Sequence, residues 1–187
     1  GVVTAIDAVH AERAGGLDAI ESAKGELIAA LPADGWAILA SDDARVMRLG
    51  ARGPAKILTA GHAEGSDVRI SSVELDQETA RTHVELRVDG ELIPVDLPLF
   101  GVQFARSAAL AIAVAKVCGV DVHTAALRLR EVQLPSGRAS VRNIGGVRMI
   151  DDTYNAAPSS MAAALATLSG ATGARFAALG AMGELGE

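Results

Sequence analysis

The sequence predicts an α/β protein, and three observations support that fold class. Short apolar segments typical of parallel strands alternate with helical segments along most of the chain. Between residues 67 and 99 apolar and polar residues alternate instead, which is typical of antiparallel strands with one exposed face. A cluster of Pro, Ser and Gly at residues 134–138 then precedes a return of the strand–helix–strand pattern. We therefore predict one α/β domain with an antiparallel section over residues 1–136, and the beginning of a second α/β domain over residues 137–187.

The first part of the chain contains the elements of a parallel sheet. Strands are expected in the segments GVVTAI (1–6), WAILA (36–40) and AKILTAG (55–61). A helix is expected over residues 17–31, because apolar residues recur there at helical spacing and Pro32 and Gly35 end it. A second helix begins in SDDARVMRLG, with Ser41 or Asp42 as its N-cap.

The remaining elements begin with the antiparallel section. Asp89 and Gly90 lie between two alternating segments, which predicts a hairpin turn. Residues 104–119 are nearly all apolar and predict a buried helix, whereas residues 121–132 predict a shorter amphipathic helix. The last expected elements are the strand VRMID (147–151), the helix SSMAAALATLSG (159–170), which Gly170 ends, and the strand RFAALG (175–180).

The composition narrows the class of protein. Half of the 187 residues are hydrophobic but only 3% are aromatic, so Ala, Val, Leu and Ile must fill the core. The net charge of -6, without a run of Lys or Arg, disfavours a nucleic-acid partner. The single cysteine, Cys118, excludes an internal disulfide framework and fits a cytoplasmic location, and we expect it to be a small buried residue. The longest apolar stretches carry charges or are too short for membrane insertion.

Chemically active side chains gather in RMIDDTYNAAPSSM (148–161). Asp151 and Asp152 follow a predicted strand, and ligands of open α/β sheets bind beyond the carboxyl ends of the strands. An acid there can accept hydrogen bonds from ribose hydroxyls, and the N-terminus of the next helix can face an anion. The alternative is that the acids only close the turn, with Ser159 or Ser160 as the helix N-cap. This stretch alone leaves both interpretations open.

The same stretch resembles a family signature. IDDTYNAAPSSM (150–161) is similar to the DDsYNANPxSm pattern of the Mur ligases, in particular the MurF type. Other segments agree with that family in order and spacing: GVVTAIDAVHAERAGGLDAIESAKGEL resembles GVVTNvgxAHlexxgsxexIaxaKgEl, AILASDD resembles AiLNaDD, LPLFGVQFARSAALAIAVA resembles lPlpGrHNxxNAlaAiAvA, PSGRASV resembles xxGRmev, and LGAMGELGE resembles lGdMxELGe. The resemblance extends over essentially the whole chain.

The resemblance implies an activity and a domain order. Such enzymes use ATP and Mg²⁺ to convert the carboxylate of UDP-N-acetylmuramoyl-tripeptide (UDP-MurNAc-tripeptide) into an acyl phosphate. The amine of D-alanyl-D-alanine then attacks this acyl phosphate during the synthesis of peptidoglycan precursors. By this resemblance, residues 1–136 are the later part of the central ATPase domain, and residues 137–187 begin a Rossmann-like C-terminal domain. We expect a cytoplasmic monomer.

The resemblance also implies a metal site near the start of the chain. His10 matches the family histidine that is associated with the second Mg²⁺. Lys24 matches the lysine that is carbamylated in Mur ligases, a change that puts a carboxylate-like group near that metal. Glu12 matches a further residue of this region. Without the family match, an exposed histidine and a helix-surface lysine would be the favoured interpretation.

A nucleotide site is implied in the second half of the chain. Arg138 matches the arginine that approaches the ATP phosphates, and Asp152 matches the acid that binds ribose. Ser107 stands where the family has an Asn against adenine. Tyr154 and Asn155 belong to the loop of Asp152 and are expected to contact nucleotide or substrate. Without the family match, Arg138 would be an ordinary linker arginine.

The chain departs from the family pattern at several positions. Alanine or serine replaces family Asn residues, the HN pair is Gln-Phe, and an Asp is lost; the positions are Ala5, Ala40, Ser107, Ala157, Gln103, Phe104 and Ala181. Neither Ala nor Phe has a side chain that can donate a hydrogen bond to a ligand. The alternative hypothesis is therefore a catalytically degenerate Mur-ligase-like binding or scaffold module.

Two parts of the family are missing from this sequence. The phosphate loop GxxGKT(T/S) is nowhere in the chain, nor is the domain that binds the UDP-sugar. The chain begins at Gly1 within a strand-like segment and ends just after another strand and turn. We therefore expect a fragment of a longer protein that has no ligase activity by itself.

Overall fold

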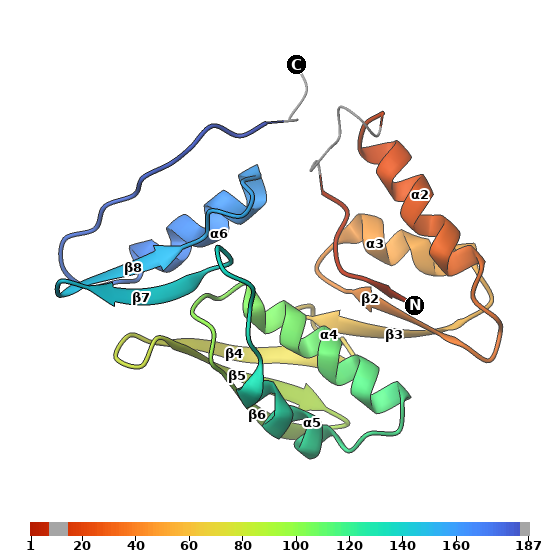
Figure 1. The fold of residues 1–187 in the computed structure, drawn as a ribbon. Coiled ribbons are helices and arrows are strands. Elements are labelled where there is room, and N and C mark those ends of the chain that lie inside the picture. The colour runs from red at the N-terminus through yellow and green to blue at the C-terminus, as the bar shows by residue number, and fades with distance from the viewer. Residues whose placement is uncertain (8–14, 184–187) are drawn as a thin grey trace.

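The computed structural model describes residues 1–7 and 15–183, and its strands form two separate sheets. The larger sheet has the order β1 (Val2–Val3), β2 (Trp36–Ala40), β3 (Lys56–Gly61), β4 (Val68–Asp76), β5 (Arg81–Val88) and β6 (Glu91–Leu97). Strands β1 to β4 pair in parallel, and β4, β5 and β6 pair in antiparallel fashion. The smaller sheet is the antiparallel hairpin of β7 (Ser140–Ile144) and β8 (Val147–Asp151) (Figure 1). The predicted α/β class with an antiparallel section is confirmed.

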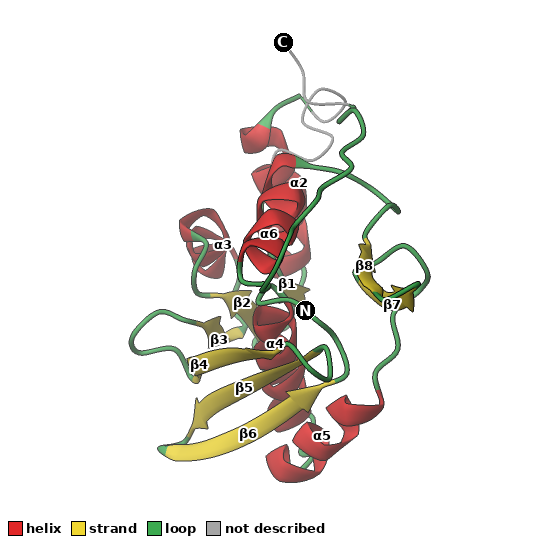
Figure 2. Cartoon of the chain, turned by 90° about the vertical axis from the view of Figure 1, so that its left-hand side faces the viewer, coloured by secondary structure: helices red, strands yellow, loops and turns green. Residues whose placement is uncertain are grey.

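Helices cover both faces of the parallel strands (Figure 2). The helices of the chain are α2 (Leu17–Ala29), α3 (Ala44–Leu49), α4 (Phe104–Val117), α5 (Val122–Arg128) and α6 (Pro158–Ser169), with 3₁₀ turns η1 (Gly50–Arg52) and η2 (Leu129–Glu131). Helices α2 and α3 lie on one face of the parallel strands and α4 on the other. In β2 the side chains of Ala37 and Leu39 pack with α2 and α3, whereas Ile38 joins the core on the α4 side. Burial on both faces explains why WAILA is a continuous apolar run rather than an alternating one.

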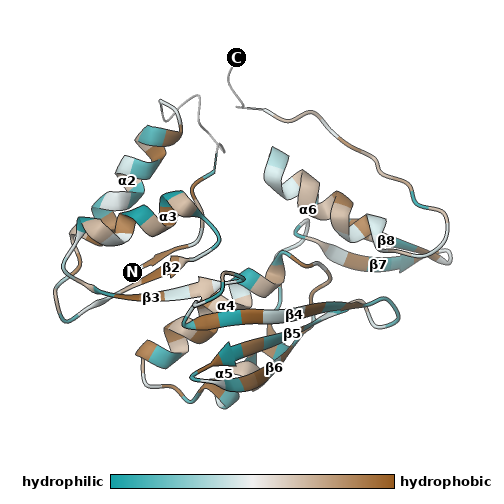
Figure 3. Ribbon diagram, turned by 180° about the vertical axis from the view of Figure 1, so that it is seen from behind, coloured by the Kyte–Doolittle hydropathy of each residue, from teal (hydrophilic) through white to brown (hydrophobic). Residues whose placement is uncertain are grey.

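Hydrophobic and hydrophilic residues alternate along the antiparallel strands (Figure 3), and the section is buried on one face only, as this alternation predicts. In β5 the side chains of Val84, Leu86 and Val88 are buried, and the residues between them are exposed. Asp89 and Gly90 have φ angles of 52° and 86°, so they form the left-handed turn that a DG pair favours between twisted strands.

The helix predictions need correction for the burial of α4, the exposure of Cys118, the N-cap of α3 and the length of α5. Residues 104–117 form α4, but only the face that includes Ala109 and Ile112 is buried, whereas Arg106 and Ser107 are exposed. Cys118, predicted to be buried, is exposed because it lies at the C-terminal end of α4.

For α3, Asp43 rather than Ser41 or Asp42 is the N-cap, since its carboxylate accepts hydrogen bonds from the amides of Arg45 and Val46 at 2.9 and 3.2 Å. The helix over residues 121–132 is also shorter than predicted and ends in a 3₁₀ turn.

The strand predictions are correct for β2 and β8 and wrong at two places. Strand β1 contains only two residues of GVVTAI, and RFAALG (175–180) forms no strand. A strand requires a partner for its backbone hydrogen bonds, and among the described residues none pairs with 175–180. Residues 147–180 therefore do not form the expected parallel strand–helix–strand arrangement. Strand β8 pairs instead with β7, which the sequence did not predict.

An ion cluster joins α2 to α3. Glu21, 8% exposed, accepts hydrogen bonds from Arg45 at 2.7 Å and from Arg48 at 2.8 Å. The bond from Arg48 is the main cause that lowers the pKa of Glu21, and Arg45 lowers it further. Because the folded-state pKa lies below the unfolded value, this cluster stabilises the protein above about pH 4.5 and loses that effect as the pH falls through the folded-state pKa.

We predict that Glu21→Gln lowers the urea midpoint of unfolding near neutral pH and that this difference disappears in acid. The protonated wild-type carboxyl then resembles the neutral amide of the variant. Urea titrations between about pH 3 and pH 7 test this, with the exposed Asp34→Asn as control. A stability difference that does not change with pH would contradict the assignment.

Candidate functional site

Lys24 lies beside the end of the first strand. Its Nζ donates a hydrogen bond of 2.7 Å to the carbonyl of Ala5, which follows β1. Helix α2 thus brings the amine of Lys24 to the carboxyl edge of the parallel sheet, where α/β proteins bind ligands. His10 and Glu12 lie outside the described residues, so the predicted pairing of His10 with Lys24 stays a prediction.

The acids at the end of β2 have structural partners. The Asp43 carboxylate that caps α3 also accepts a hydrogen bond of 2.7 Å from the amide of Ile6. Asp42 accepts hydrogen bonds from the amides of His62 and Ala63, at 2.7 and 3.1 Å. These bonds fasten the loops after β1 and β3 to the end of β2 and fix the shape of the edge on which Lys24 lies.

The loop of Arg138 is fastened to the loop of Asp152. The Asp152 carboxylate accepts a hydrogen bond of 3.0 Å from the amide of Ala139, and the amide of Tyr154 donates one of 2.9 Å to the carbonyl of Gly137. Gly137 has a φ of 77°, and a Cβ there would lie only 3.2 Å from the Tyr154 nitrogen. A glycine is therefore needed at 137 for the two loops to approach this closely.

Arg138 stacks on an aromatic ring. Its guanidinium carbon lies 3.9 Å from the centroid of the Tyr154 ring, which is a cation–π contact. Both side chains are exposed. Within the described part of the chain, the Arg138 guanidinium has no hydrogen-bond or ion-pair partner. The ring therefore holds a cation whose donors remain available to an anion.

The two adjacent acids have different partners. Asp151 accepts hydrogen bonds from Thr153, at 2.7 Å from the hydroxyl and 3.3 Å from the amide. The hydroxyl bond is the main cause that lowers the pKa of Asp151. Asp151 thus closes the turn, as one of the two interpretations proposed, whereas Asp152 holds the neighbouring loop. The Asn155 side-chain oxygen accepts a hydrogen bond of 2.9 Å from the amide of Ala156, which leaves its amide group as a donor.

Helix α6 starts differently from the prediction. Its N-cap is Ala157, not Ser159 or Ser160, and Pro158 occupies the first helical position, where its missing amide is not needed. The hydroxyl of Ser160 accepts a hydrogen bond of 3.0 Å from the Ala157 amide. The hydroxyl of Ser159 instead donates a hydrogen bond to the carboxylate of Asp7, the last described residue after β1.

The Ser159–Asp7 bond was not predicted from the sequence. Asp7 stands where the family pattern quoted above has glycine, which is the signal that could have drawn attention to it. The bond joins the loop of Asp152 to the segment that Lys24 contacts through Ala5. A hydrogen bond thus links the segments that carry the two halves of the predicted site.

Ser107 lies apart from these residues. It is exposed on α4, and none of its described contacts reaches Arg138 or Tyr154. At the start of the same helix, the hydroxyl of Thr167 in α6 donates a hydrogen bond of 3.5 Å to the side-chain oxygen of Gln103. The structure therefore brings Arg138, Asp152 and Tyr154 together and places Ser107 on a separate element.

A cavity of about 580 Å³ lies between the large sheet and the hairpin. Its wall includes the guanidinium-bearing residues Arg81, Arg138 and Arg148. Arg81 is paired with Asp96 at 2.8 Å, and Arg148 donates to backbone carbonyls, so of these three only Arg138 lacks a hydrogen-bond or ion-pair partner in the described structure.

The described residues do not by themselves form a Mg²⁺ site. No group of three His, Cys, Asp or Glu side chains among them could hold a metal ion. An ammonium such as that of Lys24 repels a cation, so it could contribute only in the carbamylated form. No reaction step through Mg²⁺ follows from this part of the chain. The same residues include no helix that is both long and apolar enough to cross a membrane.

Comparisons with known proteins identify relatives of this chain. Residues 1–115 match the Mur ligase middle domain. Over 171 residues, or 90% of the chain, it is 34% identical to UDP-N-acetylmuramoyl-tripeptide--D-alanyl-D-alanine ligase of Mycobacterium bovis and 38% identical to the enzyme of that name from Synechocystis. The chain spans only 33% and 35% of these two relatives, about a third of their length.

Solved structures agree with the sequence relatives. A crystal structure of MurF from Acinetobacter baumannii matches with a TM-score of 0.90 and 29% identity, over 100% of this chain and 40% of that chain. The crystal structure of MurF ligase from Thermotoga maritima in complex with ADP matches with a TM-score of 0.78 and 27% identity, over 100% of this chain and 43% of that chain.

We predict that Asp152→Ala releases the loop of Arg138. A hydrogen bond to a charged group contributes about 1.5–3 kcal/mol, so hydrogen exchange at the Ala139 amide should accelerate about tenfold or more. Asp152→Asn, which keeps an oxygen acceptor, should show a smaller effect. Exchange measured by mass spectrometry on a peptide over 137–141 tests this, with Asp34→Ala as control. Unchanged exchange in Asp152→Ala would mean that this bond does not hold the loop.

Proposed function

Since this chain belongs to the Mur ligase family, we propose that the full-length protein uses ATP and Mg²⁺ to join D-alanyl-D-alanine to UDP-MurNAc-tripeptide. The observation that carries the proposal is the match of the whole chain, in sequence and in fold, to proteins named as this ligase. We assign the reaction to peptidoglycan precursor synthesis in the cytoplasm and the protein to the monomeric state. We place the boundary between the central and C-terminal domains at 136–137.

The proposed reaction makes the peptide carboxylate reactive by transferring a phosphoryl group to it. Such a transfer needs positioning and charge neutralisation more than covalent help from the protein. Arg138 is suited to this role because its planar guanidinium can bind phosphate oxygens through two donors, and the Tyr154 ring holds it in place. We assign Arg138 to the ATP phosphates.

Asp152 is suited to bind the nucleotide ribose. One carboxylate oxygen accepts the Ala139 amide, and the other has no partner among the described residues, so it can accept from a ribose hydroxyl. The same carboxylate would then hold both the nucleotide and the loop of Arg138. Asn155 and Tyr154 are assigned to nucleotide or substrate contacts from the same loop, and Ser107 to the adenine side.

Lys24 and His10 are assigned to the metal region. A carbamylated Lys24 keeps one N–H, so its hydrogen bond to the Ala5 carbonyl can persist while the new carboxylate points beyond it. Mg²⁺, when bound, would neutralise phosphate charge. His10 is retained in this assignment on the family pattern alone.

A second candidate function has specific support. At two positions where the family has Asn, the side chains of Ala40 and Ala157 are 0% and 5% exposed. Packed methyl groups there can offer no hydrogen bond to a ligand. This favours a Mur-ligase-like module that has lost activity and binds a nucleotide, a cell-wall precursor or a partner protein.

One experiment separates the two functions. Phosphate release by the full-length protein is measured with ATP, Mg²⁺, UDP-MurNAc-tripeptide and D-alanyl-D-alanine, leaving out one component at a time. Release that needs every component supports the ligase. Nucleotide binding without phosphate release supports the degenerate module. So does the absence of both nucleotide binding and phosphate release.

We predict that Lys24→Ala lowers ligase activity at least about a hundredfold, because the substituted side chain can no longer carry a carboxylate. Short carboxylic acids such as acetate should restore part of the activity. Lys56→Ala serves as the matched control, since Lys56 lies over the Trp36 ring on the opposite edge of the sheet, where β3 begins. Parental activity in Lys24→Ala, or an equal response to acetate in both variants, would remove Lys24 from the site.

A further inference from the structure

The turn between β4 and β5 is held in a fixed shape. The Asp76 carboxylate accepts hydrogen bonds from the amides of Glu78 and Thr79, at 2.8 and 3.1 Å, and from the Thr79 hydroxyl. Ala80 has a φ of 54°, a left-handed conformation that a non-glycine residue adopts only where its surroundings impose it. With the turn closed in this way, the carbonyls of residues 77 and 78 point outward.

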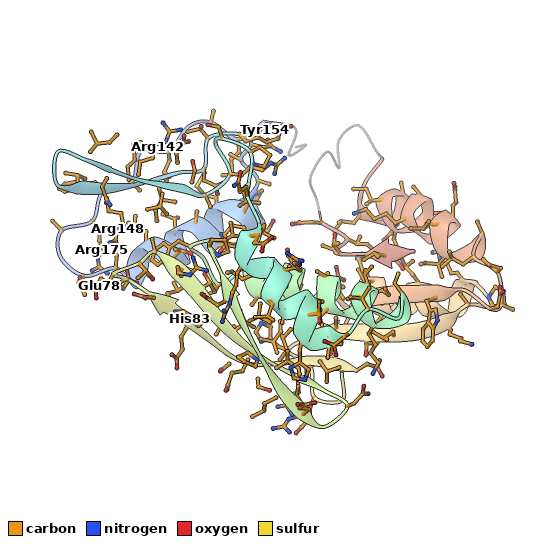
Figure 4. The ribbon with its side chains drawn as sticks, turned by 60° about the horizontal axis from the view of Figure 1, so that its bottom comes forward. Glu78, His83, Arg142, Arg148, Tyr154 and Arg175 are labelled. Atoms are coloured by element: carbon orange, nitrogen blue, oxygen red, sulfur yellow. The ribbon has the colours of Figure 1, made fainter. Side chains whose placement is uncertain are left out.

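The hairpin contacts this turn through Arg148. The Arg148 guanidinium on β8 donates to two consecutive carbonyls, those of Gln77 and Glu78, the second at 3.2 Å. Figure 4 shows Arg148 and Glu78 side by side where the hairpin meets the large sheet. Because the guanidinium is flat and rigid, two bonds to neighbouring carbonyls fix its direction as well as its position.

The same turn also contacts the end of helix α6. The side-chain amide of Gln77 lies 3.4 Å from the carbonyl of Gly170, the C-cap of α6, and donates to it. Near the other end of the helix, Ser159 donates to Asp7. Ser159 and Gly170 are separated along the helix by roughly 16 Å, at about 1.5 Å per residue. Two contacts this far apart prevent α6 from rotating about either one of them, which a single contact would allow.

Among the residues that the structure describes, few apolar contacts hold the two parts together, since no residue of α6 belongs to the hydrophobic core of the large sheet. Thr167 is the only residue of α6 that is buried, and the described bonds across the junction are polar. The orientation of residues 137–170 on the large sheet therefore depends on a small number of directed hydrogen bonds. Arg138 and Asp152 belong to the part that is positioned in this way.

We propose that the turn at residues 76–81 is the docking point that orients the hairpin and α6, and that Arg148 is a positioning residue for the nucleotide site. This inference rests on the proposed function, because the positioned groups are those assigned to ATP. Arg148 itself contacts no reacting atom in this assignment. It acts by keeping Arg138 and Asp152 over the carboxyl edge of the sheet.

The test measures orientation and kinetics separately in the full-length protein. Spin labels at Cys118, which is exposed on α4, and at a cysteine introduced by Thr172→Cys report the distance between the two parts; any other cysteine is replaced by serine. The variants are Arg148→Ala and Arg148→Lys. The matched control is Arg142→Ala, because Arg142 lies on the same hairpin and, among the described residues, the hydrogen-bond and ion-pair partners of its side chain are only Ser136 and Asp151.

We expect Arg148→Ala to broaden the distance distribution and to raise the KM for ATP about tenfold, with a smaller change in kcat. Arg148→Lys should be intermediate, since an ammonium lacks the flat fork, and Arg142→Ala should match the parent. Gln77→Ala, which removes the contact to Gly170, should broaden the distances in the same direction and provides the test if Arg148→Ala does not fold.

Unchanged distances in Arg148→Ala and Gln77→Ala would overturn the inference, whatever the activity. Changed distances with an unchanged KM in an active parent would overturn the positioning role. If the parent neither binds nucleotide nor releases phosphate, the proposed function fails, and the distances alone then decide whether the turn is the docking point.

Discussion

The hydrogen bond from the Ala139 amide to the Asp152 carboxylate is the interaction on which the candidate site depends. It joins the loop that leaves the first part of the chain to the loop that follows β8. Together with the bond from the Tyr154 amide to the Gly137 carbonyl, it holds in place the two loops whose side chains, Arg138 and Tyr154, stack on each other. A carboxylate is suited to this role because it has two oxygens, so one can hold the protein while the other remains free for a ligand.

The large sheet and the hairpin contribute differently to this site. The parallel strands, buried on both faces, form a rigid edge. There Asp42 and Asp43, which follow β2, hold the loops after β3 and β1 by hydrogen bonds. The hairpin and α6 meet that edge through polar bonds at separated points, with little buried apolar surface. A junction of this kind transmits orientation through a few directed contacts, because the described residues form no packed core across it.

The departures from the family pattern are not spread evenly. Arg138, Asp152, Tyr154 and Asn155 are retained in one connected arrangement, whereas Ala40 and Ala157 fill buried positions with methyl groups. Asp7, in contrast, adds a carboxylate where the pattern has glycine, and Ser159 donates to it. At Ala40 and Ala157 the chain thus lacks polar groups at buried positions, and at Asp7 it has one that links its two parts.

Local sequence alone determined the strands β2 and β8, the turn at Asp89 and Gly90 and the one-sided burial of β5, because hydrophobic periodicity and turn chemistry act between near neighbours. The proximity of Arg138 to Asp152 also followed from the sequence, by way of the family pattern. Only the tertiary structure decided that 175–180 is not a strand, that Cys118 is exposed and that Asp7 meets Ser159. Each of these depends on a partner distant in the chain or on the lack of one among the described residues, and no local pattern encodes that.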